Sequence, residues 1–360
     1  MPEAARPAQQ PAPQTPLPPA RQLSQQIISL WVPQAIHAAA ELGIADALAA
    51  KPATAAEVAA RLGTHADATA RLLNALVTLG LLTLEEGRFG LTELGRCLVS
   101  DSPTSVRAWS RLMGGAEVWR AWGRLADCVR SGRAAWSATG GERISDTEQF
   151  DAWSSDAEGA AVFHQAMVEM TRGAAPGIVA AIDFAGVRRV VDVGGGYGAL
   201  LCAALEAHPQ IDGAVFDLAH ARNGALALFA ARGLEARASF AAGDFFRDRP
   251  PAADVYLMKS VIHDWDDARS LQILARCREA MREGDRLLMV EPPAPPPGEQ
   301  HGSPLAWVIA FSDLNMLVNT GGRERTAAEY RALLETAGLR VAAVHAPPGS
   351  FFHVFEAVRG

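Results

Sequence analysis

Lysine is almost absent from this sequence. Of the 33 basic residues in the 360-residue chain, only Lys51 and Lys259 are lysines, and the other 31 are arginines. Acidic residues outnumber basic ones, which gives a formal net charge of −7. Because a protein that binds nucleic acid through its phosphates carries a surplus of positive charge, the composition argues against a nucleic-acid partner.

Cysteine and long apolar runs are also scarce. The four cysteines are Cys97, Cys128, Cys202 and Cys277. They form no Cys-x-x-Cys or Cys/His cluster, so neither a zinc site nor a disulfide framework is predicted. No stretch reaches the roughly 18 apolar residues of a membrane span. Residues 1–20 are rich in Pro, Ala and Gln and lack the apolar segment of a signal peptide. We therefore expect a disordered leader on a cytoplasmic protein with no membrane partner.

Residues 21–130 form the first predicted domain, which is mainly helical. Gln22–Ala39 is predicted to be helical and is more apolar than one helix face needs, which suggests that it is buried on several sides. Thr54–Leu62 starts with the sequence of a capping box, and Asp67–Leu79 is a second amphipathic helix. A β-hairpin that turns at Glu86 follows. Helix, turn, helix and hairpin together indicate a winged helix.

A winged helix raises the alternative of a regulator with a ligand-sensing domain. Residues 21–100 hold six basic and seven acidic residues, and Arg71 is the one cation on the helix that would enter a DNA groove. A protein that reads a duplex needs positive charge around that helix. A role in dimerisation, or as a lid, is therefore favoured.

Strands and helices alternate from residue 171 to the C-terminus. Short apolar runs such as Val187–Val193 are predicted strands, and amphipathic helices separate them, which is typical of a doubly wound, mostly parallel α/β sheet. Leu339–His345 and Phe352–Val358 are joined so closely that they can pair only as an antiparallel hairpin. Residues 131–170 are predicted to be a linker and a connecting helix.

A glycine-rich run, Val-Val-Asp-Val-Gly-Gly-Gly-Tyr-Gly, follows the first of these strands. Gly194, Gly196 and Gly198 permit a tight turn against a ligand. The run also satisfies the dinucleotide fingerprint, so an NAD-dependent oxidoreductase is an alternative. However, Asp192 would face the pyrophosphate of a dinucleotide, which is a contact between like charges. S-adenosylmethionine (SAM) has no phosphate and carries cationic groups, so an acid at this position favours SAM.

Two further strand ends extend the predicted cofactor site. Asp217 ends the next strand, where its carboxylate can accept hydrogen bonds from both ribose hydroxyls. Gly243, Asp244 and Phe245 follow the third strand, where a carboxylate beside an aromatic ring suits adenine. Because parallel sheets bind ligands at the carboxyl ends of their strands, these residues are expected to lie around one pocket.

A histidine follows the fourth strand of the predicted sheet. At this position His263 can act as a general base near neutral pH. A helix capped at Asp266 or Asp267 comes directly after it and is expected to fix the loop. Glu291 ends the next strand, and Glu324 lies in a Gly-Gly-Arg-Glu-Arg-Thr run. Both are candidates to orient the imidazole.

The ordered series VVDVGGGYG, DL, GDFF, KSVIHDWDD, VEPP and GGRERT resembles the SAM-dependent O-methyltransferases of the caffeic acid/acetylserotonin (hydroxyindole) type, which have bacterial relatives in antibiotic biosynthesis. The resemblance extends from about Leu23 to the C-terminus. It implies a class I methyltransferase Rossmann-like fold and a homodimer formed through the winged-helix dimerisation domain. It also implies metal-independent methyl transfer to the hydroxyl of a phenolic or polycyclic aromatic metabolite.

The resemblance further implies roles for single residues. His263 is the general base, and Glu291 and Glu324 hold its ring. The residues implied to bind the cofactor are Thr171, Gly194, Gly196, Gly198, Asp217, Gly243, Asp244, Phe245, Lys259 and Ser260. The residues implied to bind the acceptor are Phe163, Met167, Asp264, Trp265 and Asn319.

Alternatives within the same fold concern the chemistry. Some relatives carry out non-methylating SAM-dependent steps such as hydroxylation or decarboxylation. Such enzymes are expected to lack the base, whereas this chain has His263. Methylation of nitrogen stays open beside methylation of oxygen, because the same base and pocket can serve a ring nitrogen. The identity of the acceptor depends on the shape of its pocket, whose walls are expected to come from residues 153–170 and 306–319.

Overall fold

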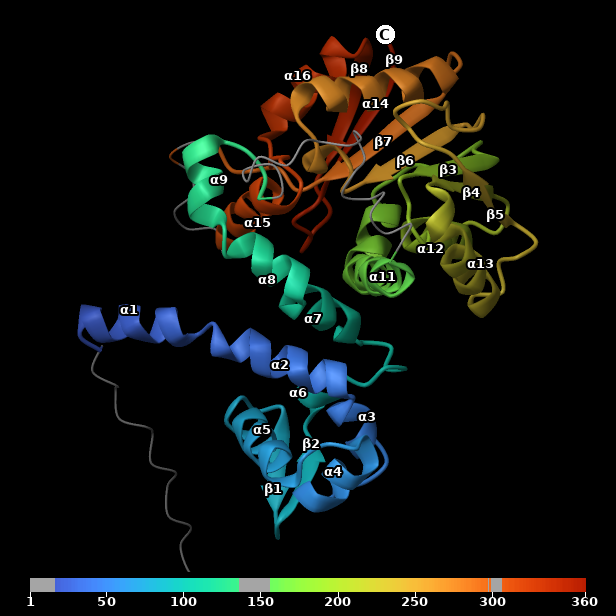
Figure 1. The fold of residues 1–360 in the computed structure, drawn as a ribbon. Coiled ribbons are helices and arrows are strands. Elements are labelled where there is room, and N and C mark those ends of the chain that lie inside the picture. The colour runs from blue at the N-terminus through green and yellow to red at the C-terminus, as the bar shows by residue number, and fades with distance from the viewer. Residues whose placement is uncertain (1–16, 136–155, 297, 299–305) are drawn as a thin grey trace, which may run out of the picture.

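The computed structural model describes residues 17–135, 156–296, 298 and 306–360. The predicted leader up to residue 16, and residues 136–155 of the predicted linker, lie outside the described residues. Figure 1 shows a smaller N-terminal part, mainly helical, and a larger part built around a sheet. None of the helices within the described ranges is long and apolar enough to cross a membrane.

The N-terminal part begins with two helices where one was predicted. Helix α1 covers Pro19–Ile28 and takes in the last two residues assigned to the leader, and α2 covers Trp31–Leu42. The prediction of a single helix over Gln22–Ala39 is wrong, and so is the expected burial on several sides within this chain, because α1 has no buried residue. In a continuous helix the ring of Pro33 would clash with the carbonyl group of Ser29, so the chain starts a new helix there.

The winged-helix outline is present in the structure. Its elements are α3 (Ile44–Leu48), α4 (Ala55–Leu62), α5 (Ala66–Thr78), and the antiparallel strands β1 (Leu82–Glu85) and β2 (Arg88–Leu91). Thr54 accepts the Glu57 N–H while the Glu57 carboxylate accepts the Thr54 N–H, so the predicted capping box starts α4. Leu73, Leu76 and Phe89 are buried in the core that joins the helices to the hairpin.

Short helices connect this part to the sheet. They are α6 (Glu93–Arg96), α7 (Arg107–Gly114), α8 (Ala116–Trp122) and α9 (Leu125–Ser131). In Figure 1 they run from α2 up to α15. Helix α7 packs on both α2 and α11. The buried Glu169 carboxylate of α11 accepts the backbone N–H groups of Ala108 and Trp109, which ties the first turn of α7 to the larger part.

The sheet has seven strands in the order β5-β4-β3-β6-β7-β9-β8. They are β3 (Arg189–Val193), β4 (Asp212–Asp217), β5 (Ala238–Ala242), β6 (Val255–Lys259), β7 (Arg286–Glu291), β8 (Leu339–His345) and β9 (His353–Arg359). Strands β3 to β7 pair in parallel, and β9 pairs antiparallel with both β7 and β8. The predicted fold class is confirmed. The strand order reverses between β3 and β6, which is where such sheets bind ligands.

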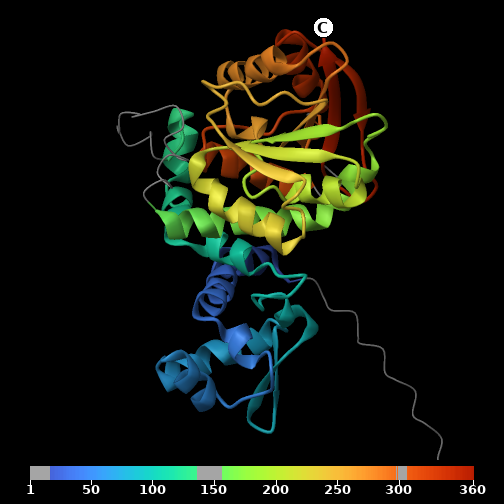
Figure 2. The ribbon, with the colours of Figure 1, turned by 90° about the vertical axis from the view of Figure 1, so that its right-hand side faces the viewer.

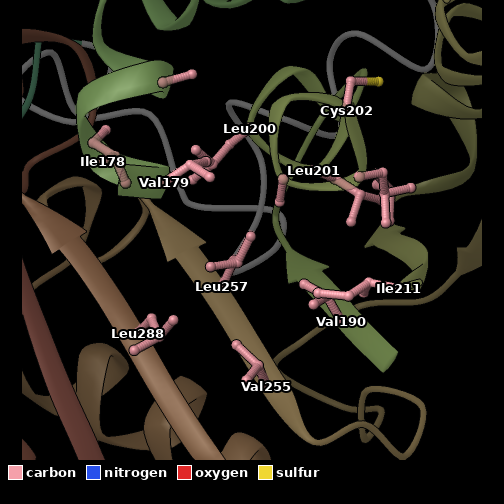
Figure 3. Packing of buried hydrophobic residues seen from close by; sticks show 14 of the residues in the cluster. Ile178, Val179, Val190, Leu200, Leu201, Cys202, Ile211, Val255, Leu257 and Leu288 are labelled. Atoms are coloured by element: carbon pink, nitrogen blue, oxygen red, sulfur yellow. The ribbon is translucent and has the colours of Figure 1, made fainter. Parts of the chain in front are cut away.

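Helices cover both faces of the sheet (Figure 2). On one face lie α11 (Ala157–Ala180), α12 (Ala199–Ala207) and α13 (Arg222–Ala231), and on the other lie α14 (Asp267–Ala280) and α16 (Ala327–Thr336). Figure 3 shows the first layer, where Ile178 of α11 and Leu200 of α12 lie over Val190, Leu257 and Leu288 of the strands. Both faces are apolar and buried, which is typical of a parallel sheet.

Candidate functional site

A cavity lies at the carboxyl ends of the strands, at the point where the strand order reverses. The predicted site residues that line it are Phe163, Met167, Thr171, Gly194, Gly196, Asp217, Gly243, Asp244, Phe245, Lys259, Ser260, Asp264 and Trp265. Four strand ends and α11 therefore bring most of the predicted cofactor and acceptor residues around one space. His263, Glu291 and Glu324 form a cluster beside it.

The glycine-rich loop between β3 and α12 forms the floor of the cavity. Gly194, Gly196 and Gly198 have φ of +66°, +57° and +81°, a conformation that other residues rarely adopt. A Cβ on Gly194 would lie 2.8 Å from a methyl group of Val261, and a Cβ on Gly198 would lie 2.7 Å from a methyl group of Val215. The missing side chains therefore permit close packing of Val261 and Val215 against the loop, while the backbone of Gly194 and Gly196 lines the cavity.

Two carboxylates lie beside this loop, the buried Asp192 and the partly buried Asp217. Asp217 accepts the backbone N–H groups of Gly196 at 2.7 Å and Leu218 at 2.6 Å. Burial raises the pKa of Asp217, and burial together with the charge of Asp217 raises the pKa of Asp192 to about 7. Because these shifts express a cost of burying negative charge, the cavity favours a ligand that brings positive charge or hydroxyl donors.

Helix α11 provides one wall. Phe163, Met167 and Thr171 are spaced by four residues, so they lie on one face of the helix and reach the cavity together. Met170, one residue before Thr171, is 37% exposed and lies on another face of the helix. The N-cap of the helix is Asp156, whose side chain accepts the Gly159 N–H.

His164 lines the same wall, and the sequence reasoning did not include it. Its Nε2 atom lies 3.2 Å from Nδ1 of His220, and its ring stacks on Tyr197 with 4.7 Å between centroids. Burial, with a contribution from His220, lowers the pKa of His164 to about 4. The ring is therefore neutral near pH 7. No spacing signal marked it, because these three residues come from three separate elements.

The end of β6 supplies the only lysine of the sheet domain. Lys259 Nζ donates to Ser260 Oγ at 3.2 Å and lies 4.5 Å from the ring centroid of Phe352. Burial lowers the pKa of Lys259 to about 8. Ser260 has a φ of 54°, which among the described residues other than glycine is matched only by Glu86. Such strained positions concentrate at functional sites, where surrounding structure holds them.

The third strand end places an acid beside an aromatic ring, as predicted. Asp244 Oδ1 accepts the Phe246 N–H at 2.9 Å, which fixes the carboxylate at the cavity wall. The ring of Phe245 packs edge-on against Phe246 and Trp265. A Cβ on Gly243 would lie 2.2 Å from the Phe216 ring, so only glycine fits at this turn.

The predicted base and its two predicted acids meet in one buried cluster. His263 lies in a 3-10 turn, Ile262–Asp264, and its Nδ1 is 3.0 Å from Glu324 Oε1 and 3.9 Å from Glu291 Oε2. On the other side of the ring, Nε2 is 3.9 Å from Asp264 Oδ1. The side chains of Glu291 and Glu324 are completely buried.

The charges of this cluster control where its protons reside. Burial by itself would lower the pKa of His263, but Glu291, Glu324 and Asp264 outweigh it and raise the pKa to about 10. Burial raises the pKa of Glu291, and it raises that of Asp264 to about 7. The imidazole therefore has a high affinity for a proton, and the carboxylates stabilise the imidazolium once it forms.

Glu291 also builds the turn that carries the histidine. Its Oε1 accepts the backbone N–H groups of Val261 at 3.0 Å and Ile262 at 2.8 Å. Asp266 then caps α14 by accepting the Arg269 N–H, which resolves the two predicted caps in favour of Asp266. The turn is thus held at both ends.

The Gly-Gly-Arg-Glu-Arg-Thr run packs against the turn that carries His263 and donates hydrogen bonds to it. A Cβ on Gly322 would lie 2.1 Å from the carbonyl oxygen of His263, so no other residue fits there. The fully buried Arg325 donates to the carbonyl groups of Ile262 at 3.1 Å and Trp265 at 2.8 Å. The sequence reasoning missed Arg325, because an arginine in a run of charges is ordinarily on the surface.

Helix α15 (Ala306–Asn319) completes the surroundings of Glu324. Ser312 Oγ donates to Glu324 Oε1 at 2.6 Å. Asn319, which was predicted to contact the acceptor, donates its amide to Asn315 Oδ1 at 2.9 Å. Trp122 Nε1 of α8 donates to the same oxygen at 3.0 Å. Asn319 therefore belongs to a polar link between α15 and α8.

This combination of a doubly wound sheet, a glycine-rich loop with acids at three strand ends, and an adjacent histidine defines a class I methyltransferase. Residues 122–340 match the O-methyltransferase domain, and residues 24–101 match the O-methyltransferase dimerisation domain. The chain therefore belongs to the O-methyltransferase family.

Similar proteins cover nearly the whole chain. Phenazine O-methyltransferase PhzM of Lysobacter antibioticus is 36% identical over 336 residues, which are 93% of this chain and 95% of that protein. The crystal structure of LaPhzM superposes with a TM-score of 0.88 at 35% identity, covering 96% of this chain and all of the other. Human N-acetylserotonin methyltransferase in complex with SAM gives a TM-score of 0.84 at 31% identity, covering 96% and 99%. The predicted enzyme class, SAM-dependent O-methylation, is confirmed.

Proposed function

We propose that this enzyme methylates a hydroxyl group of a small aromatic metabolite, with His263 as the general base. The observation that carries the proposal is the contact of His263 Nδ1 with the buried Glu324 carboxylate at 3.0 Å, directly beside the cavity. Val261, Asp264 and Trp265, which flank the histidine along the chain, line that cavity. The named relatives that act on phenazine and on acetylserotonin support an aromatic acceptor.

The cavity suits SAM by the chemistry of its lining. Gly194 and Gly196 line the cavity, and the acids Asp192 and Asp217 favour cationic groups and hydroxyl donors. The other residues that would hold it are Thr171, Gly243, Asp244, Phe245, Lys259 and Ser260. Bound SAM would supply a methyl group on a positively charged sulfur, which is an activated leaving group.

The protein's part in the reaction is alignment and proton removal. Glu324 accepts the Nδ1–H of His263, so the lone pair of the neutral ring is on Nε2, the atom that takes the proton of the acceptor hydroxyl. Glu291 and Glu324 then stabilise the imidazolium. A pKa of about 10 for His263 matches that of a phenol, which is also about 10, so the transfer is close to balanced. The proposal requires no metal ion.

The acceptor would lie between α11 and the histidine turn. Phe163 and Met167 offer apolar contacts from the helix, and Trp265 offers an aromatic edge from the turn. Asp264, on the Nε2 side of His263, is placed to accept a hydrogen bond from a polar group of the acceptor.

We further propose that the enzyme is a cytoplasmic homodimer joined through its N-terminal helices, without a nucleic-acid partner. Leu23, Ile27 and Trp31 of α1 and α2 are 58%, 61% and 64% exposed, respectively, and an apolar surface of this kind is typical of an interface. The match of residues 24–101 to a dimerisation domain supports the same arrangement. Sedimentation of the purified protein would test it, and a monomer would contradict it.

The decisive experiment is an acceptor screen with labelled SAM, followed by the His263→Ala variant. The panel contains phenols, polycyclic hydroxyaromatics and aromatic amines, and product analysis separates O-methylation from N-methylation and from non-methylating chemistry. We expect His263→Ala to lower kcat by about 10²- to 10⁴-fold, which is the usual contribution of a general base. The Kd for SAM, measured by calorimetry, should stay within about twofold of the parent value. Undiminished turnover would reject His263 as the base.

A further inference from the structure

One oxygen of Glu324 accepts two hydrogen bonds. Oε1 receives Nδ1–H of His263 at 3.0 Å and the hydroxyl hydrogen of Ser312 at 2.6 Å. The other oxygen, Oε2, is buried without a hydrogen-bond partner among the described residues. The charge of this carboxylate is therefore shared between the histidine and the serine.

We propose that Ser312 is a positioning residue that sets the proton affinity of His263 by competing with it for the charge on Glu324 Oε1. The proposal rests on the proposed role of His263 as the base. The serine does not line the cofactor cavity, and it reaches the histidine through Glu324. A hydroxyl group is suited to this task, because it donates a hydrogen bond without bringing a charge or a titratable proton of its own.

The geometry of α15 holds the serine in place. Glu324 N–H donates to Oδ1 of Asp313 at 2.8 Å, so the backbone and the side chain of Glu324 are bound by two consecutive residues of one helix. Downstream, Thr326 begins α16 with a capping box formed with Glu329. Glu324 is thus fixed between two helices, and its Oε1 cannot turn away from the serine without breaking a tertiary contact.

The rest of the cluster explains why such a donor matters. The groups that face His263 are Asp264 from its own turn, Glu291 from β7 and Glu324 from the loop before α16. All three favour the imidazolium, which cannot accept a proton. The phenol of Tyr330 and the guanidinium of Arg325 lie behind the carboxylates. Ser312 offsets one of the three acids and so keeps more of the imidazole neutral.

The test is the pH profile of acceptor turnover in Ser312→Ala and Ser312→Thr. The acceptor must be a phenol that ionises above the scanned range, so that only the enzyme titrates. Without the serine, Glu324 holds the imidazolium more firmly. We expect the acid limb of kcat/KM to move up by about one pH unit, because a hydrogen bond to a charged group changes its proton affinity by about this much. Below the limb the rate should fall about tenfold, and above it the two rates should converge.

Ser312→Thr keeps a hydroxyl group and should restore the parental limb. The Kd for SAM and the thermal unfolding of both variants should match those of the parent, since Ser312 lies outside the cavity lining. A Ser312→Ala limb at the parental pH would overturn the inference, and so would a loss that is the same above and below the limb. If His263→Ala remained active, the proposed function itself would fail. If His263→Ala were inactive while Ser312→Ala kept the parental profile, only the present inference would fail.

Discussion

Two groups of ionisable residues lie side by side at the carboxyl ends of the strands. The cofactor cluster contains Asp192, Asp217 and Lys259, and the histidine cluster contains His263, Asp264, Glu291 and Glu324. Their surroundings affect positive charge in opposite ways. In the cofactor cluster the pKa of Asp192 is raised to about 7 and the pKa of Lys259 is lowered to about 8, both by burial, so that each charged form is disfavoured. In the histidine cluster, carboxylates outweigh burial and raise the pKa of His263 to about 10. The first cluster disfavours its own charges, whereas the second stabilises the charge of the imidazolium that it contains.

The difference arises mainly from the charges of the neighbouring acids, since Glu291, Glu324 and Asp264 all raise the pKa of His263, and the hydrogen bond to Glu324 adds to their effect. Lys259 Nζ donates to a neutral hydroxyl, that of Ser260, and faces the ring of Phe352. His263 Nδ1 instead contacts a carboxylate at 3.0 Å. A direct charged hydrogen bond compensates for lost hydration, and a more distant charge does so only in part. The cofactor cluster is therefore suited to an external cation, and the histidine cluster is suited to creating one during the reaction.

The largest expected effect comes from removing one charge of the histidine cluster. Glu291→Gln keeps an oxygen that can accept the Val261 and Ile262 N–H groups, so the turn should stay folded. It removes a negative charge beside the imidazole, and we expect kcat to fall about 10²-fold. Steady-state kinetics at saturating SAM measure this. Glu279→Gln, the same change at an exposed carboxylate bound by Arg276, serves as the control and should leave kcat unchanged. Equal kinetics in both variants would contradict the assignment of Glu291.

The next effect belongs to the cofactor cluster. Asp217→Asn replaces one carboxylate oxygen by an amide, which cannot accept a hydrogen bond from a ribose hydroxyl. We expect the Kd for SAM to rise about 10- to 100-fold, as for other hydrogen bonds to charged groups. At saturating SAM, kcat should stay within a few-fold of the parent. Calorimetry measures the Kd, and Asp212→Asn at the exposed opposite end of the same strand is the matched control. A fall in kcat with unchanged SAM affinity would contradict this prediction, because Asp217 would then serve the chemical step rather than cofactor binding.

These two clusters also differ in how well the sequence predicted them. Most of the cofactor cluster could be predicted from the sequence, because its glycines and acids come directly after strands that short apolar runs identify. Asp192, Asp217 and Asp244 each end or follow a strand, and parallel strands place their carboxyl ends at one edge. The fold followed from the same alternation of strands and helices. The break between α1 and α2 was missed, although Pro33 was visible in the sequence.

The histidine cluster was predicted only in part. His263 follows a strand, and a resemblance supplied the role of Glu324, which by sequence alone is a charge in a turn. Ser312 and Arg325 had no signal, because a serine on a helix and an arginine in a charged run are ordinarily solvent-exposed. Their contacts with Glu324 and with the turn carbonyls depend on how α15 and the loop after it pack. Tertiary packing, not local pattern, decides these roles.

The pH dependence of turnover is a third test of the histidine cluster. The base must be neutral, and its neighbours raise the pKa of His263 above the ordinary value of 6.5. We therefore expect kcat/KM to rise about tenfold per pH unit above neutral pH, up to a limb between that ordinary value and about 10. A positive charge bound beside the cluster shifts the limb toward the lower end. A limb at or below pH 6.5 would contradict the stabilised imidazolium.

The smallest expected effect concerns stability without ligand. The pKa of Asp192 is raised in the folded protein, so the unfolded chain releases this proton more readily, and folding loses stability as pH rises from about 4 to about 7. Asp192→Asn removes this cost. At pH 8 we expect the variant without SAM to be about 1–3 kcal/mol more stable to urea, with a smaller gain at pH 5.5 and weaker SAM binding.

Asp254→Asn, at the opposite end of the sheet, supplies the control of opposite sign. Burial would raise the pKa of Asp254, but the N–H groups of Arg188 and Arg189 and nearby positive charges outweigh it and lower the pKa. That carboxylate stabilises the fold once ionised, so its loss should lower stability at pH 8 and matter less as the pH falls toward the pKa. If both variants lost stability at pH 8, Asp192 would be an ordinary structural acid. Opposite signs, together with weakened SAM binding in Asp192→Asn alone, would identify Asp192 as an acid kept at a cost to folding because the cofactor cluster needs its charge.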